Sequence, residues 1–191
     1  MEEFEIKFLE VDVPALEKKL VEIGAEKTGE YDYARMLLDY PDFRLDKNYS
    51  WIRLRTDGRE TTLAFKADIK EKMPDGTMKD VGMKETEISV DDYDKTSKLM
   101  QAVGFVIKRE EKNKRIRYTK GNVVFDIDFW PGIPPYIEIE SSSFKEAEDA
   151  AVLLGFYPKE GLICSAGTVY RKYGIEPKDY SSITFDGMVK K

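Results

Sequence analysis

The sequence contains no histidine, a single cysteine and no apolar run long enough to cross a lipid bilayer. The lack of histidine excludes Ser-His-Asp triads, histidine general bases and every histidine-containing metal site. Any metal ion must therefore be held by carboxylates, and carboxylate ligands favour Mg²⁺ or Mn²⁺. The lone cysteine, Cys164, cannot form an internal disulfide and is expected to be a small buried thiol.

Charge is abundant, and acidic residues are in excess. Charged residues make up 36% of the chain, well above the usual share of about a quarter. The net charge of -6 and the isoelectric point of about 5.0 disfavour a general nucleic-acid binder, since such proteins are normally basic. The first residues, MEEFEIKFLEVD, are too acidic and have too little apolar content for a signal peptide. We therefore expect a cytoplasmic protein that binds neither a membrane nor a specific nucleic acid.

Strands dominate the expected secondary structure. Alternating and apolar segments predict eight strands, near residues 2–10, 34–40, 50–56, 60–68, 80–90, 105–118, 122–130 and 135–141. Helical spacing and capping residues predict helices over 13–23, 91–103 and 144–154, and a short one over 163–173. This pattern is typical of an α+β fold, and eight antiparallel strands can close a small barrel with helices packed outside. We expect one domain over 1–173 and a loosely packed tail over 174–191.

Charged side chains recur on one face of several of these strands. Residues two apart in a strand point to the same side of the sheet. Like charges recur at this spacing in Glu3 and Glu5, Arg53 and Arg55, Glu85 and Glu87, Asp126 and Asp128, and Glu138 and Glu140. For any one strand, the simplest interpretation is a face turned to water. Taken together, the pairs would repel unless a counter-ion, a metal or a ligand offset them, which favours charged faces that line a shared wet interior.

An interior of this kind favours one class of ligand. Clustered arginine and lysine favour phosphate, because arginine forms bidentate hydrogen bonds and lysine acts as a point charge. Clustered carboxylates without histidine favour Mg²⁺ or Mn²⁺. A chamber that holds both sets is suited to a complex of a metal ion with a polyphosphate. Trp51 and Trp130 are interpreted as packing residues at the rim of the barrel.

The same residues resemble a known family. The segment Glu3-Phe4-Glu5-Ile6-Lys7 resembles the ExExK signature of the CYTH superfamily, whose members are also called triphosphate tunnel metalloenzymes. Later segments follow the order of that family: WIRLR at 51–55, LAFK at 63–66, KETEISV at 84–90 and DFWPGIPPYIEIE at 128–140. The resemblance covers roughly residues 1–173 and implies an eight-stranded antiparallel tunnel.

The resemblance also implies roles for individual residues. The catalytic residues would be Glu3, Glu5 and Lys7. A cofactor ion, Mg²⁺ or Mn²⁺, would be held by Glu3, Glu5, Glu87, Asp128, Glu138 and Glu140. The triphosphate would be gripped by Lys7, Arg53, Arg55, Lys66 and Arg115. Glu85 and Glu87 would hold metal through water or orient the basic residues.

One strand departs from the pattern of the family. Members often have Lys-x-Arg on the strand before the aspartate, whereas Asn113 takes the lysine position here. Lys112, Lys114 or Arg117 would substitute for it, depending on bulges in the strand. The register of residues 112–117 is therefore left open by the sequence.

Three functions are compatible with these residues. The first is metal-dependent hydrolysis of inorganic tripolyphosphate or of an organic or nucleoside triphosphate. The second is a class IV adenylyl cyclase, which would convert ATP to cyclic AMP and pyrophosphate. The third is a non-catalytic protein that binds polyphosphate or a nucleotide, although so many carboxylates exceed what binding alone needs. In each case the partner is a small triphosphate compound, and a homodimer is compatible with the sequence.

Overall fold

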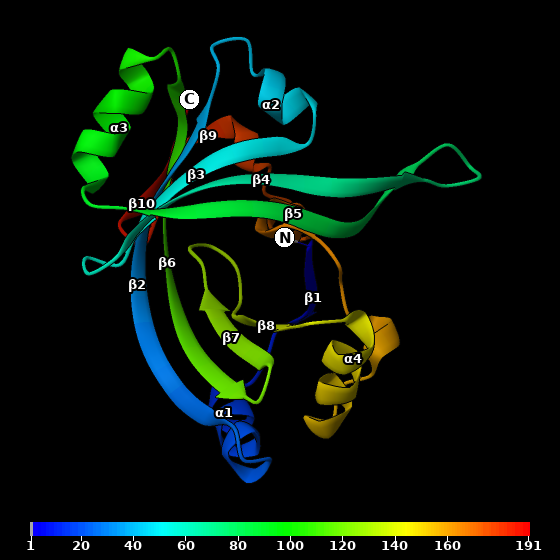
Figure 1. The fold of residues 1–191 in the computed structure, drawn as a ribbon. Helices are drawn as coiled ribbons and strands as arrows, with labels where there is room; N and C mark the ends of the chain where they lie inside the picture. The colour runs from blue at the N-terminus through cyan, green and yellow to red at the C-terminus, as the bar shows by residue number, and fades with distance from the viewer. Residues whose placement is uncertain (1) are drawn as a thin grey trace.

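Eight antiparallel strands form a ring. A computed structural model of the protein describes residues 2–191, apart from the side chains of residues 2, 3 and 80. The strands are β1 (Glu2–Leu9), β2 (Glu26–Asp39), β3 (Ser50–Thr56), β4 (Thr61–Lys72), β5 (Met78–Val90), β6 (Val106–Lys120), β7 (Val123–Phe129) and β8 (Tyr136–Ser141). Their order is β6-β2-β3-β4-β5-β1-β8-β7, and β7 pairs again with β6, which closes the ring (Figure 1). The predicted α+β class and the eight-stranded antiparallel barrel are confirmed.

The register between strands decides which charges oppose one another. Directly opposite residues of an antiparallel pair point to the same side of the sheet. Lys7 of β1 lies opposite Glu138 of β8, and Arg115 of β6 lies opposite Asp128 of β7. The register thus places opposite charges side by side on the inner face of the barrel, although they lie far apart in the sequence.

Helices lie on the outside of the barrel (Figure 1). The predicted helices correspond to α1 (Val13–Glu22), α3 (Tyr93–Ala102), α4 (Phe144–Leu153) and α5 (Ala166–Lys172). Asp12, Asp92 and Ser143 cap the first three, because each side chain accepts a hydrogen bond from the backbone N–H three residues later. In the described part of the chain, no helix has the length and apolar character needed to span a membrane.

The apolar faces of the strands pack beneath α1 and α4. Ile6, Phe8, Ile137 and Ile139 are buried there with Leu20 of α1 and with alanines of α4. Full burial of one such large side chain stabilises a fold by about 1.5–3 kcal/mol. Because side chains alternate along a strand, the same packing turns the charged residues of β1 and β8 toward the interior.

One short helix was not predicted from the sequence. The helix α2 (Arg44–Lys47) has four residues, too few for a periodic pattern. Asp39, which is fully buried at the end of β2, holds this turn by accepting hydrogen bonds from the backbone N–H groups of Tyr40, Leu45 and Asp46. These bonds fix Asp46 at the edge of the interior. The strand before it, β2, begins at Glu26 rather than near residue 34 as predicted.

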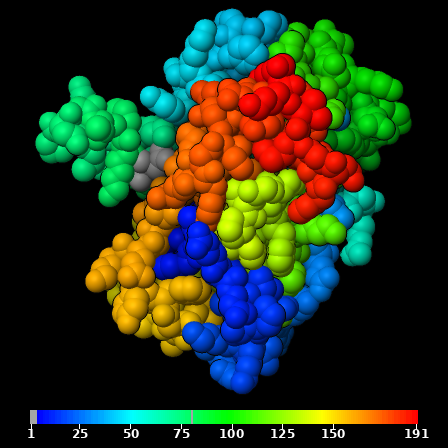
Figure 2. Space-filling model, turned by 180° about the vertical axis from the view of Figure 1, so that it is seen from behind, coloured from blue at the N-terminus to red at the C-terminus, as the bar shows by residue number. Residues whose placement is uncertain are grey.

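The C-terminal segment is folded, so the expected loose packing of residues 174–191 is corrected. It contains a 3-10 turn, η2 (Pro177–Asp179), and a hairpin of β9 (Tyr180–Thr184) and β10 (Gly187–Lys190); a further 3-10 turn, η1 (Pro158–Glu160), follows α4. The strand β9 pairs in parallel with β6, and Ile183 is fully buried. Figure 2 shows this segment in red across the back of the molecule. The division into a domain over 1–173 and a separate tail stays a prediction.

Replacement of Ile183 by valine tests the packing of this hairpin. The free energy of unfolding should fall by about 0.5–1.5 kcal/mol, because a methylene group is lost from a fully buried site. Urea denaturation followed by circular dichroism measures the change. The matched control is Val189→Ala on β10, where the side chain is 57% exposed and the change should stay within about 0.5 kcal/mol. Equal effects of the two substitutions would contradict the observed packing.

Candidate active site

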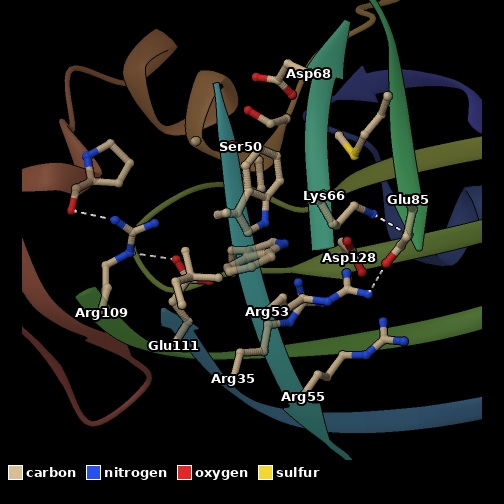
Figure 3. Close-up of a pocket in the computed structure, with 18 of the residues that line it drawn as sticks. Arg35, Ser50, Arg53, Arg55, Lys66, Asp68, Glu85, Arg109, Glu111 and Asp128 are labelled. Atoms are coloured by element: carbon tan, nitrogen blue, oxygen red, sulfur yellow. Dashed lines mark hydrogen bonds and ion pairs between the residues drawn. The ribbon is translucent and has the colours of Figure 1, made fainter. Parts of the chain in front are cut away.

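A cavity of about 580 Å³ lies inside the barrel. Each of the eight strands of the ring contributes at least one charged side chain to its lining. Glu5, Arg53 and Glu138, which the alternation of charges predicts to converge, all line this one cavity. In Figure 3, Arg53, Lys66 and Glu85, which come from three consecutive strands of the ring, point toward one another in this cavity. The charged faces of the strands therefore form an interior surface.

The basic wall of the cavity comes from β3 and β4. Arg53 donates hydrogen bonds from Nη2 to Glu85 and Glu87 over 2.8 and 2.7 Å. The Nζ atom of Lys66 lies 2.6 Å from a carboxylate oxygen of Glu85 (Figure 3). Arg55 contacts Glu87 over a longer distance of 3.4 Å. Glu85 and Glu87 of β5 thus orient the basic side chains of β4, the adjacent strand, and of β3, the strand beyond it.

Lys7 is held between two carboxylates. Its Nζ atom lies 2.6 Å from Glu5 and 2.8 Å from Glu138, and the residue is only 1% exposed. Burial opposes the charged form of Lys7, but Glu138 and Glu5 outweigh it and raise its pKa above the ordinary value. Burial likewise opposes the charged form of Glu138, but Lys7 and Arg115 lower its pKa below the ordinary range. Both groups are therefore charged at neutral pH.

Arg115 is the centre of a buried ion-pair network. Its guanidinium group binds both carboxylate oxygens of Asp128, over 2.6 and 2.7 Å. It also binds Asp126 over 2.5 Å and Glu138 over 2.7 Å. Arg117 binds Asp126 from the more exposed side, with two hydrogen bonds of 2.7 Å. The network joins β6, β7 and β8 and gives Asp126, Asp128 and Glu138 a cationic partner.

Glu140 differs from the other acidic residues of the cavity. Among the described residues, none forms an ion pair with Glu140. The residue opposite it across the β1–β8 pairing is another glutamate, Glu5. Burial and the negative charges of Glu5 and Glu138 raise the pKa of Glu140. A cation placed beside these carboxylates would relieve their repulsion.

The carboxylates of the cavity have the ligand chemistry that suits a hard divalent cation, but several of them already contact a lysine or an arginine. Within the described part of the chain, no three aspartate, glutamate or cysteine side chains are arranged to hold a metal ion. Lys7 contacts Glu5 and Glu138, and Arg115 contacts Asp128 and Glu138, so these carboxylates have cationic partners. Glu5 and Glu138, whose charges act on Glu140, offer carboxylate oxygens, which suit Mg²⁺ or Mn²⁺.

Arg35 is a cavity residue that was not predicted from the sequence. Its guanidinium group is buried, forms no ion pair with a described carboxylate, and has no hydrogen-bond partner at Nε among the described residues. Burial, with the nearby charges of Arg53, Arg55 and Arg115, lowers the pKa of Arg35 to about 10. The group still carries its charge at neutral pH. In Figure 3 it lies beside Arg53 and Arg55.

The remaining predicted residues have the following places. The side chain of Glu3 lies outside the described part of the structure. Glu87 is paired with Arg53 and Arg55, and Asp128 with Arg115. On β6, Arg115 and Arg117 line the cavity, Asn113 is fully buried on the same face, and Lys112 and Lys114 pair with exposed acidic residues on the other face. Of the three candidates, Arg117 is the one that lines the cavity, and its role as a substitute for the lysine of the family stays a prediction.

A second group of charged residues at one end of the cavity was also not predicted. Asp46 of α2 binds Lys108 over 2.8 Å and Lys178 over 2.6 Å. Arg109 donates hydrogen bonds to Glu111 and to the carbonyl oxygen of Pro177 (Figure 3). These contacts tie the C-terminal segment to the barrel beside the cavity. No sequence signal could have found them, because η2 lies outside the periodic part of the chain.

The fold and the cavity together define a class of protein, the antiparallel barrel with a charged interior. The sequence matches the family model of the CYTH domain over residues 1–162, so the chain belongs to the CYTH family. Members of this family are mostly metal-dependent triphosphatases or class IV adenylyl cyclases. The resemblance inferred from the motifs is thereby confirmed. No protein of curated function matches the sequence significantly.

Solved structures share the fold at low sequence identity. The PH1012 protein from Pyrococcus horikoshii OT3 is 19% identical, with a TM-score of 0.68 over 85% of this chain and 96% of its own. A candidate adenylate cyclase from Vibrio parahaemolyticus is 14% identical, with a TM-score of 0.74 over 90% of this chain and 98% of its own. A candidate adenylyl cyclase from Hippeastrum, described as having a dominant triphosphatase activity, is 16% identical, with a TM-score of 0.64 over 94% and 99% of the two chains. At these identities the likeness concerns the fold.

Proposed function

We propose that this chain hydrolyses a triphosphate compound inside the barrel, with Mg²⁺ or Mn²⁺ as cofactor. The observation that carries the proposal is one cavity lined by many basic and many acidic side chains. Arg35, Arg53, Arg55 and Lys66 line one side through β2, β3 and β4, whereas Glu5, Glu138 and Glu140 line the other through β1 and β8. A volume of about 580 Å³ is typical of a small-molecule site. A chain of phosphates and a divalent cation would be complementary to these two sides.

The basic residues would bind and orient the phosphate groups. Arginine offers paired N–H donors that match phosphate oxygens, and Arg53 and Arg55 alternate on β3 so that both guanidinium groups face the cavity. Lys7 and Arg115 would supply fixed positive charge near the acidic side. Because these groups are held before the ligand arrives, they would stabilise charge that develops on the phosphoryl oxygens in the transition state.

The acidic residues would have two tasks. Glu5, Glu138 and Glu140 would hold the divalent cation, which when bound supplies Lewis-acid polarisation of the phosphoryl oxygens. Glu5 would also accept a proton from the attacking water at a carboxylate oxygen, with Lys7 orienting that carboxylate through its 2.6 Å contact. Glu3 is proposed to assist from the same strand, and Asp128 and Glu87 to complete the acidic set.

Product analysis tests this function directly. The protein is incubated with Mg²⁺ or Mn²⁺ and, in separate reactions, with tripolyphosphate, thiamine triphosphate or ATP. We expect release of inorganic phosphate, and no release when the metal is chelated, because the phosphoryl oxygens then lack their polarising cation. Cyclic AMP with pyrophosphate would instead identify a class IV adenylyl cyclase. Tight binding of all three compounds without turnover would contradict catalysis and identify a binding protein.

A further inference from the structure

The cations of the cavity are held in place in two different ways. Lys7, Arg53, Lys66 and Arg115 each contact a carboxylate within 2.8 Å, so their charge is largely offset in the unliganded protein. Arg35 forms no ion pair with any described carboxylate. A buried arginine without an anionic partner is costly to maintain, and the surroundings must stabilise it by other means.

Two aromatic rings take the place of a carboxylate. The central carbon of the Arg35 guanidinium lies 4.7 Å from the centre of the Trp130 ring and 5.4 Å from that of Tyr33. Arg55 lies 4.7 Å from the centre of the Tyr33 ring. These distances fall within the range of cation–π contacts, in which the negative face of a ring attracts a positive charge. Tyr33 therefore serves two arginines, and Trp130 serves one.

The rings are themselves fixed by the fold. Tyr33 and Arg35 are two residues apart on β2 and share its inner face, and the Tyr33 ring stacks on Tyr31 with an angle of 3° between their planes. Trp130 follows β7 directly and packs edge-on against Tyr170. The Tyr170 hydroxyl donates a hydrogen bond to the carbonyl oxygen of Pro131, next to Trp130. Both ring faces are thus set before any ligand enters.

A ring and a carboxylate have different effects on an arginine. A carboxylate fixes the guanidinium group but cancels its charge, so an incoming phosphate must compete for it. A ring fixes the group through its quadrupole and leaves the net charge in place. Arg35 and Arg55 both line the cavity, where the charge of Arg35 has no carboxylate partner among the described residues and that of Arg55 has only the longer contact with Glu87. We propose that Tyr33 and Trp130 are positioning residues that hold Arg35 with its charge free, and Arg55 with its charge only partly offset by the 3.4 Å contact with Glu87, for the phosphate groups of the ligand; this rests on the proposed function of the cavity.

Paired substitutions of Tyr33 and Trp130 distinguish the effect of the aromatic face from the effect of side-chain volume. Tyr33→Leu and Trp130→Leu remove the aromatic face, whereas Tyr33→Phe and Trp130→Phe keep one. The phenylalanine variant of Trp130 gives up no hydrogen bond, because the indole N–H has no partner among the described residues. Isothermal titration calorimetry with tripolyphosphate in Mg²⁺ buffer, together with KM and kcat, should show affinity weakened about 2- to 30-fold in the leucine variants. The phenylalanine variants should stay within about twofold of the wild type.

Testing Trp130→Leu in a protein that already lacks Arg35 distinguishes a residue that positions Arg35 from one that only supports the fold. In an Arg35→Gln protein, Trp130→Leu should weaken affinity by less than about twofold further, since the group that Trp130 holds is gone. A structural role would persist in that background and would contradict the proposal, as would equal affinities of the leucine and phenylalanine variants. The Tyr33 pair decides the question even if Trp130→Leu does not fold. If wild-type protein binds none of the triphosphates, the proposed function fails first, and this inference fails with it.

Discussion

Substitution of Arg115 by methionine should destabilise the protein by about 3–5 kcal/mol, the largest effect on stability that the structure implies. Arg115 is the shared partner of Asp126, Asp128 and Glu138. Without it, buried carboxylates face one another with too few cations to offset their charge. For a chain of this length, such a loss corresponds to a decrease of about 6–20 °C in the melting temperature. Thermal unfolding followed by circular dichroism in metal-free buffer measures it.

A neighbouring arginine provides the control for this substitution. Among the described carboxylates, Arg117 forms an ion pair with Asp126 alone, and its side chain is 31% exposed. Arg117→Met should therefore cost less than about 1 kcal/mol, because Asp126 keeps its contact with Arg115 and the lost pair is partly screened by water. A double variant, Arg115→Met with Asp128→Asn, should recover part of the loss. Stability of the Arg115 variant within error of wild type would show that the network is not formed in solution.

Substitution of Glu140 by glutamine should have opposite effects on activity and on stability. We expect the rate of triphosphate hydrolysis to fall roughly 100-fold or more, since even residues that only orient metal ligands contribute 10- to 100-fold. Stability without metal should be unchanged or higher, because Glu140 lacks an ion pair and its pKa is raised by burial, Glu5 and Glu138. Phosphate release at increasing Mg²⁺ or Mn²⁺ and unfolding in a chelator provide the two measurements.

The two readouts make this experiment sharper than an activity assay alone. Substitution of a residue that matters only for folding would lower the stability and the activity of the protein together. Glu148→Gln, on the exposed face of α4, is the isosteric control and should change neither quantity. A Glu140→Gln protein that hydrolyses tripolyphosphate at the wild-type rate would remove Glu140 from the proposed metal site.

Much of the barrel could be predicted because its strands carry a strict two-residue alternation. Glu5 and Lys7 on β1, and Glu138 and Glu140 on β8, alternate with apolar residues that pack beneath α1 and α4. That contrast fixes which face is buried against helices, and the recurrence of charge on the other face implies a charged interior. The helices were predictable for a similar local reason, because Asp12, Asp92 and Ser143 mark their beginnings.

The pairing of charges could not be predicted, because it depends on contacts between distant strands. The contact between Lys7 and Glu138 requires the register of β1 against β8, which no local pattern encodes. Arg35 was missed because β2 was expected to begin near residue 34. The alternation of Tyr31, Tyr33 and Arg35 along one face of the strand was therefore not recognised. The hairpin of β9 and β10 was missed because strands of five and four residues are too short for a periodic signal. The pairing of β9 with β6 depends on tertiary structure alone.

The position of the first strand has a consequence for how the chain reaches its native state. The strand β1 is not at the edge of the ring but between β5 and β8, so its neighbours are supplied by the middle and the later part of the sequence. During synthesis, the ammonium group of Lys7 must remain hydrated until residues 136–141 have been made and bring Glu138 to it. Contacts of such long sequence separation are slow to form. Closure of the ring is therefore a late event of folding, and the half-formed sheet exposes unpaired strand edges that are prone to association until then.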